Sequence, residues 1–172
     1  MSMAGRLKVC FIGLGSIAKR HINNLKFVSQ KKGIDLSIDA YRHRINSAVI
    51  EGIDHIYYHI NQIPNDYDVI FITNPTNLHF SSLKSFHEKG KHFFIEKPAA
   101  SIEEIEEAQK FRQRKESIYY VACPLRYHAV IQYIKENMDR NNVISVRSIS
   151  SSYLPDWRPG QDYRNSYSAH KK

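Results

Sequence analysis

The sequence predicts an α/β protein built on a doubly wound parallel sheet with the strand order 3-2-1-4-5-6. Three observations lead to this fold class. Short apolar runs alternate with amphipathic stretches along residues 1–122. Residues 69–73 read Val-Ile-Phe-Ile-Thr, a run that is typical of a strand buried on both faces. A glycine-rich turn separates the first apolar run from the first amphipathic stretch, as in a strand–turn–helix unit.

The elements follow in order along the chain. We expect strands at residues 7–12, 36–41, 56–58, 69–73, 92–95 and 118–122. Helices are expected at residues 16–29, at 78–88 with Gly90 as the C-terminal cap, after Ser101, and at 129–138. One face of the first helix is apolar and predicts packing against the sheet; it carries Ala18, Ile22, Leu25 and Val28. A long strand is expected at residues 143–151.

The composition is that of an ordinary globular protein, with 42% apolar and 24% charged residues. No apolar run approaches the ~20 residues that span a bilayer, and we find no signal peptide, so no membrane partner is expected. Cys10 and Cys123 are too few for a disulfide framework, and the chain is expected to be cytoplasmic. The net charge of +8 is spread along the chain, which favours an anionic small molecule over nucleic acid. The spacing of His87, Glu88 and His92 does not fit a zinc motif, so no metal is expected.

The glycine-rich turn has the pattern G-x-G-x-x-A, formed by Gly13-Leu14-Gly15-Ser16-Ile17-Ala18. Gly13 permits the tight turn, Gly15 lets a pyrophosphate approach the backbone, and Ala18 allows the helix to pack closely on the strand. The N–H groups at the start of the following helix, including those of Ser16 and Ile17, then face the phosphates together with the positive end of the helix dipole. The pattern therefore predicts a Rossmann-type dinucleotide site.

Two registers of the second strand lead to different cofactors. Asp39 lies 21 residues after Ala18, where an acid binds the adenosine ribose of NAD, but its neighbours Ile38 and Ala40 suggest that it is internal to the strand. If the strand ends later, Tyr41 takes the place of the acid and Arg42-His43-Arg44 follows. A guanidinium there suits the 2′-phosphate of NADP. We favour the second register, with Arg42 as the cofactor contact and NADP over NAD.

Two further segments are expected at the carboxyl edge of the sheet, where doubly wound folds bind their ligands. Thr73, Asn74 and Pro75 follow the fourth strand, and His79 follows them as a contact to cofactor or substrate. Glu96-Lys97-Pro98 follows the fifth strand, next to the expected nicotinamide position. A lysine there can donate a hydrogen bond to a substrate oxygen and stabilise charge during hydride transfer, while the proline fixes the backbone.

These motifs together resemble the glucose–fructose oxidoreductase / inositol dehydrogenase (Gfo/Idh/MocA) family. The resemblance covers roughly residues 6–150 and rests on the order and spacing of four blocks, at residues 9–21, 68–79, 90–98 and 124–127. It implies an NAD(P)-dependent oxidoreductase that acts on sugars, sugar derivatives or polyols. It also implies that Lys97 is the catalytic lysine, that Glu96 and Lys97 line the nicotinamide pocket, and that Arg126 borders the substrate.

This sequence departs from the family pattern beyond residue 150. Members of the family are about twice as long, and their second domain carries an Asp/His pair that transfers the proton. We therefore expect an NAD(P)-binding domain at residues 1–122 and a truncated remnant of an α+β substrate and dimerisation domain at 123–172. The 172-residue chain is expected to bind dinucleotide, to turn over weakly or not at all, and to form homo-oligomers through residues 125–172. The alternative is a non-catalytic dinucleotide-binding protein.

Overall fold

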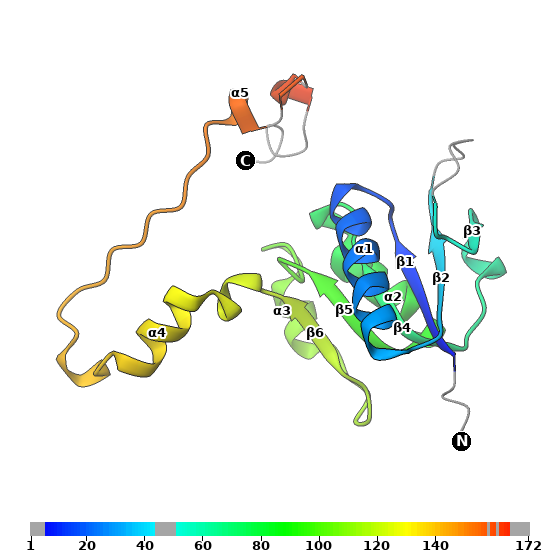
Figure 1. Ribbon diagram of the computed structural model, residues 1–172, viewed down its shortest axis with the longest axis horizontal. Helices are drawn as coiled ribbons and strands as arrows, with labels where there is room; N and C mark the ends of the chain where they lie inside the picture. Colours follow the sequence, from blue (N-terminus) through cyan, green and yellow to red (C-terminus); the bar gives the residue numbers. More distant parts are fainter. Residues whose placement is uncertain (1–5, 44–50, 158, 161, 166–172) are drawn as a thin grey trace. The chain divides into compact units, whose positions relative to one another are not determined.

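The described part of the chain, residues 6–43, 51–157, 159–160 and 162–165, forms one six-stranded parallel sheet in this computed structural model. Its strands are β1 (Leu7–Ile12), β2 (Leu36–Tyr41), β3 (His55–Tyr57), β4 (Tyr67–Ile72), β5 (Gly90–Glu96) and β6 (Tyr119–Ala122). Figure 1 shows them in the order β3-β2-β1-β4-β5-β6. The predicted doubly wound fold and its strand order are confirmed.

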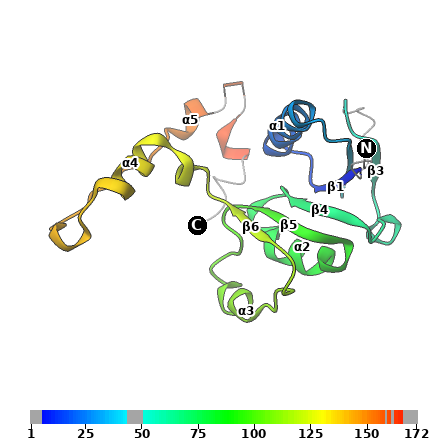
Figure 2. The ribbon, with the colours of Figure 1, turned by 60° about the horizontal axis from the view of Figure 1, so that its bottom comes forward.

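Helices cover both faces of the sheet, as Figure 2 shows. Helix α1 (Ser16–Lys32) packs on one face, in an apolar cluster that includes Val9, Phe11, Ile22 and Ile38. Helices α2 (His79–Phe86) and α3 (Ile105–Lys110) pack on the other, in a cluster built around residues 70, 72, 80, 83 and 93. The strand order reverses between β1 and β4, and right-handed crossovers that run in opposite directions place their helices on opposite faces.

Helix α1 is longer than predicted and presents a different last turn to the sheet. It continues to Lys32 because Gly33, in the left-handed conformation at φ 65°, closes it with a hydrogen bond from Ile34 N to Ser29 O of 2.9 Å. Val28, which we expected on the packed face, is 44% exposed, whereas Ser29 is buried. At about 100° per residue, position 29 lies within about 20° of Ala18 on the helix surface, and position 28 lies about 80° away.

Gly90 has a different role from the predicted helix cap. A 3-10 turn at His87–Lys89 follows α2, and Gly90 begins β5 with an extended φ of −148°. A Cβ at this position would lie 2.5 Å from Cγ1 of the fully buried Ile70. Glycine is therefore explained by the close contact between β4 and β5.

The chain divides into two units, Met1–Cys123 and Pro124–Lys172. The second contains α4 (Ala129–Asn137) and the short α5 (Leu154–Trp157). The strand predicted at 143–151 is wrong, because these residues carry no strand assignment and Ile144, Val146 and Ile149 are largely exposed. An alternating apolar pattern becomes a strand only where another strand pairs with its backbone, and no described segment pairs with this one.

Candidate functional site

The glycine turn lies at the point where the strand order of the sheet reverses. Gly13 has a φ of +91°, and a Cβ there would lie 2.8 Å from Cα of Asn74. Its N–H donates to Tyr41 O at 3.0 Å, and the Thr73 hydroxyl donates to Gly13 O at 3.0 Å. The turn is thus held by the ends of β2 and β4, and only glycine satisfies both its dihedral angle and its closeness to Asn74.

The first turn of α1 has the properties that a pyrophosphate requires. Gly15 is the N-cap residue, so no side chain caps the first N–H groups, and the first turn carries no acidic residue. A Cβ at Gly15 would meet no atom of the chain within 4 Å, which leaves the approach to the backbone open. Ser16 is exposed and Ile17 half-buried, while Ala18 is fully buried against the sheet. These residues fit the phosphates of a dinucleotide.

A cavity of about 870 Å³ opens beside the glycine turn. Its walls come from the ends of β1 and β2, the loop after β4, and one side of α2; they include Gly13, Tyr41, Arg42, Asn74, Pro75, Leu78 and Ser81. Arg42 is half-buried and is anchored through its backbone N–H, which donates to Tyr57 O at 2.9 Å. Its guanidinium nitrogen Nη1 is buried and has no hydrogen-bond partner within the described part of the chain. Arg42 therefore belongs to the cavity wall and carries one donor nitrogen that has no partner among the described residues.

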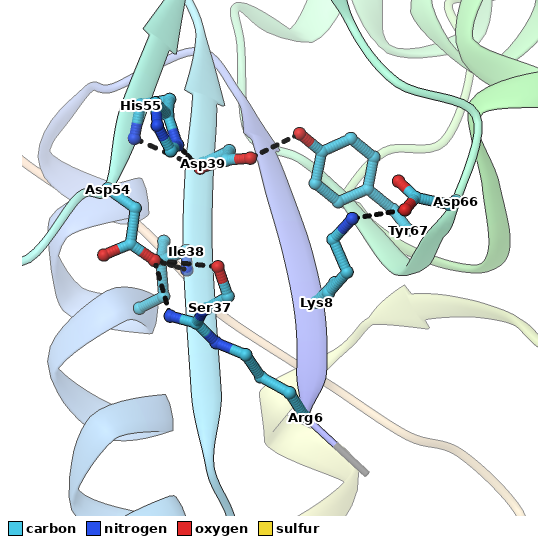
Figure 3. A network of polar contacts seen from close by, with 9 residues as sticks. All are labelled: Arg6, Lys8, Ser37, Ile38, Asp39, Asp54, His55, Asp66 and Tyr67. Carbon is cyan, nitrogen blue, oxygen red and sulfur yellow. Dashed lines mark hydrogen bonds and ion pairs between the residues drawn. The ribbon is translucent and has the colours of Figure 1, made fainter.

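Asp39 belongs to a polar network inside the sheet and not to this cavity (Figure 3). The residue is 5% exposed, and its carboxylate accepts hydrogen bonds from the Tyr67 hydroxyl at 2.5 Å and from the backbone N–H of His55 at 3.1 Å. Burial, together with the bond to Asp39, raises the pKa of Tyr67 far above its ordinary value, so the phenol keeps its proton and donates it. Strand β2 ends at Tyr41, as in the register that we favoured.

The residues after β4 form a tightly bonded loop. Thr73 is buried, and its hydroxyl also lies 3.1 Å from Ile12 O. Asn74 donates from Nδ2 to Ser82 Oγ at 2.7 Å, while its buried Oδ1 has no partner among the residues described. Pro75 is exposed at the cavity. His79 is only 2% exposed, and its two ring nitrogens face backbone oxygens, Nδ1 at 2.6 Å from Pro98 O and Nε2 at 2.9 Å from Asn74 O. A direct contact between His79 and a ligand stays a prediction.

Glu96, Lys97 and Pro98 follow one another at the carboxyl end of β5. The Lys97–Pro98 peptide bond is cis, and the Lys97 side chain is exposed. Glu96 Oε1 lies 2.7 Å from Nε2 of His21, which belongs to α1. Sequence reasoning missed His21, although its place three residues after the buried Ala18 indicates the sheet-facing side of the helix.

The other predicted positions are placed as follows. Arg126 lies in a 3-10 helix of the second unit, where its residue is exposed, and its contact with substrate stays a prediction. Arg44 lies outside the described residues. Within the described ranges, no group of three or more His, Cys, Asp and Glu is arranged to hold a metal ion. Across the same ranges, none of the helices has both the length and the apolar character that crossing a membrane requires.

Comparison with known proteins supports the reading of the fold. A family model described as "oxidoreductase family, NAD-binding Rossmann fold" matches residues 7–123. The uncharacterized oxidoreductase YrbE of Bacillus subtilis is 35% identical over 111 residues, which are 62% of this chain and 32% of that protein. UDP-N-acetylglucosamine 3-dehydrogenase of Acidithiobacillus ferrooxidans is 24% identical over 126 residues, 73% of this chain and 39% of that protein. The chain thus spans about a third to two fifths of the length of these relatives.

Solved structures of dehydrogenases share the fold of this chain. The WlbA dehydrogenase of Chromobacterium violaceum, in complex with NADH and UDP-GlcNAcA, has a TM-score of 0.61 at 20% identity and covers 79% of this chain and 40% of its own. Myo-inositol 2-dehydrogenase of Lactobacillus plantarum has a TM-score of 0.60 at 25% identity, with 77% and 40% covered. With the parallel sheet and the glycine turn at its switch point, the match over residues 7–123 shows that the chain belongs to the Gfo/Idh/MocA oxidoreductase family with an NAD-binding Rossmann fold.

Proposed function

We propose that the chain binds NAD or NADP at the carboxyl edge of its sheet and provides Lys97 for hydride transfer to or from a sugar, sugar derivative or polyol. The observation that carries the proposal is the open first turn of α1, with uncapped N–H groups beside Gly15 and no acidic residue in that turn. A positive helix end without a side-chain cap is a suitable site for phosphate. Gly13, Gly15, Ser16 and Ile17 would hold the pyrophosphate there.

Arg42 supports NADP as the preferred cofactor. Its buried Nη1 has no partner among the described residues, and the residue belongs to the wall of the cavity beside the turn that would hold the pyrophosphate. The adenosine ribose would occupy this cavity, where a 2′-phosphate would satisfy the guanidinium by a charge-assisted hydrogen bond. Asp39 does not compete for the ribose, because Tyr67 and His55 already use its carboxylate.

Lys97 is the proposed catalytic residue. Its ammonium would donate a hydrogen bond to the oxygen of the reacting hydroxyl or carbonyl group and stabilise the negative charge that develops on it. The nicotinamide, when bound, accepts or supplies the hydride. Thr73, Asn74 and Pro75 would line the cofactor on the β4 side, and Glu96 on the β5 side. The relatives support the substrate class, since one solved structure contains UDP-GlcNAcA and another, of scyllo-inositol dehydrogenase from Lactobacillus casei, contains NAD(H) and scyllo-inositol.

We also propose that residues 125–172 mediate homo-oligomers. Within this range large apolar side chains are more than half exposed; they include Leu125, Val130, Tyr133, Ile144, Val146, Ile149 and Tyr153. Apolar surface of this extent is typical of an interface. Sedimentation velocity at several concentrations should show association that Ile144→Lys weakens, and a monomer at all concentrations would contradict this proposal.

Titration of the 172-residue chain with NADH and NADPH, followed by cofactor fluorescence, tests the binding site. Replacing Arg42 by Ala should weaken NADPH binding by about 10- to 100-fold, since a hydrogen bond to a charged group contributes roughly 1.5–3 kcal/mol. NADH binding should change little. Arg6→Ala is the control, because Arg6 pairs with Asp35 and Asp54, outside the cavity wall. A chain that binds neither cofactor would contradict the proposed function.

The catalytic role of Lys97 requires a separate measurement. Inositols and UDP-sugars would be offered to the wild-type chain and to Lys97→Ala with either cofactor. Turnover by the wild type that Lys97→Ala abolishes, with cofactor affinity retained, is the expected result for an enzyme. Cofactor binding without turnover would favour the alternative, in which this chain is a dinucleotide-binding module without catalysis.

A further inference from the structure

Lys97 stands between two residues that are each bonded to a histidine from a different helix. On its N-terminal side, the Glu96 carboxylate lies 2.7 Å from His21 Nε2 of α1. On its C-terminal side, the carbonyl oxygen of Pro98 lies 2.6 Å from His79 Nδ1 of α2. Because α1 and α2 cover opposite faces of the sheet, the two residues next to Lys97 are held from both faces, Glu96 by its side chain and Pro98 by its backbone carbonyl.

The His21–Glu96 pair is well shielded from water. The two side chains are 19% and 12% exposed. The imidazole also packs edge-on against Phe94, with ring centroids 4.9 Å apart at 67°. A hydrogen bond between groups with so little access to water is stronger than one at the surface, and loss of either partner leaves the other poorly solvated. The direction of the Glu96 side chain is thus tied to α1.

His79 connects the loop after β4 to the loop after β5. It is buried as the first residue of α2, and its second ring nitrogen lies 2.9 Å from Asn74 O. Both neighbours are carbonyl oxygens, which only accept hydrogen bonds, so a ring nitrogen that carries a hydrogen donates to the oxygen it faces. The ring therefore lies directly between the backbone of the proposed cofactor loop and the residue after Lys97.

We propose that His21 and His79 are positioning residues for Lys97, which they fix by holding Glu96 and Pro98. This inference rests on the catalytic role of Lys97 proposed above. The lysine stem has four flexible carbons, and hydride transfer requires the reacting groups within a narrow range of distances and angles. Holding the Glu96 side chain and the Pro98 backbone limits where the Lys97 ammonium can reach, and thereby orients it toward one substrate oxygen.

The test follows the Lys97 amine directly and needs no turnover. Lysine amines of the 172-residue chain are methylated reductively with ¹³C-formaldehyde, and the Lys97 resonance is assigned by its loss in Lys97→Arg. We expect His21→Leu to shift and broaden this resonance, His21→Gln to restore it in part by keeping an N–H donor, and Glu96→Gln added to His21→Leu to shift it no further. His79→Gln should shift it as well.

His87→Gln is the matched control. This ring is similarly shielded, at 17% exposure, stacks on Phe93, and lies 2.6 Å from the Tyr119 hydroxyl, but it has no contact with residues 96–98 in the described structure. Its substitution should leave the Lys97 resonance in place. An unshifted Lys97 resonance in His21→Leu, or an equal shift in His87→Gln, would overturn the inference. Failure of the wild-type chain to bind NADH or NADPH would instead overturn the proposed function, since the resonance is observed without cofactor.

Discussion

Two glycine substitutions in one turn are expected to affect different properties: Gly13→Ala should lower stability, and Gly15→Ala should lower cofactor affinity. In Gly13→Ala, the new Cβ would lie 2.8 Å from Cα and 3.0 Å from N of Asn74, at a φ of +91°. The positive φ costs about 1–2 kcal/mol and the contact with backbone about 1–3 kcal/mol, so the free energy of unfolding should fall by roughly 2–5 kcal/mol. In Gly15→Ala, φ is −74° and the Cβ meets no atom within 4 Å, so stability should fall by less than about 1 kcal/mol.

Gly15→Ala should instead weaken cofactor binding, although it changes stability little. The methyl group of Gly15→Ala would occupy the space through which a pyrophosphate reaches the first amides of α1. We expect NADH and NADPH affinity to fall at least about tenfold, equivalent to 1.4 kcal/mol, in a protein that remains folded. Urea denaturation and cofactor fluorescence measure the two effects separately. Wild-type affinity in Gly15→Ala would refute the proposed phosphate site, and wild-type stability in Gly13→Ala would refute the steric argument.

Three further predictions concern the sheet. Gly90→Ala should reduce stability by about 1–3 kcal/mol in urea denaturation, and should cost less in an Ile70→Ala background; an equal cost in both would exclude the contact with Ile70 as its cause. The hydrogen bond from the Ser37 hydroxyl holds the pKa of Asp54 below its usual 3.8. The ionised Asp54 therefore stabilises the fold above pH 3.8, and this stabilisation is lost as the pH falls below that value. The Tm of Ser37→Ala should therefore fall less steeply with decreasing pH than the Tm of the wild type. Parallel profiles of Tm against pH would contradict this. Burial raises the pKa of the Cys10 thiol, which should resist alkylation in the native protein and react after unfolding in urea; rapid native alkylation of Cys10 would show that β1 is accessible.

The sequence was most informative where local chemistry alone determines the structure. The bounds of β1 and β2 agree with prediction, because apolar runs and a glycine turn delimit them. Asp39 was recognised as internal from its two apolar neighbours, although its partner Tyr67 was not foreseen. The pattern indicated that Asp39 is internal to the strand, but it could not show which distant hydroxyl bonds to its buried carboxylate.

Features that depend on distant segments could not be predicted. His21 and Glu96 are 75 residues apart, and nothing local in the sequence signals that they meet. The pattern at residues 143–151 favoured a strand, but pairing depends on a partner that the described residues do not supply. The contact of Gly90 with Ile70 likewise depends on the register between β4 and β5, so the glycine was assigned to the wrong element.

The sheet is bounded on its two sides by its shortest strands, β3 with three residues and β6 with four. Each outer strand offers little backbone for the addition of another strand, which makes ribbon-like growth of the sheet through a neighbouring molecule unfavourable. Natural selection or protein engineering could therefore vary the helices and loops of this domain widely while the borders of the sheet still protect it from fibrous aggregation.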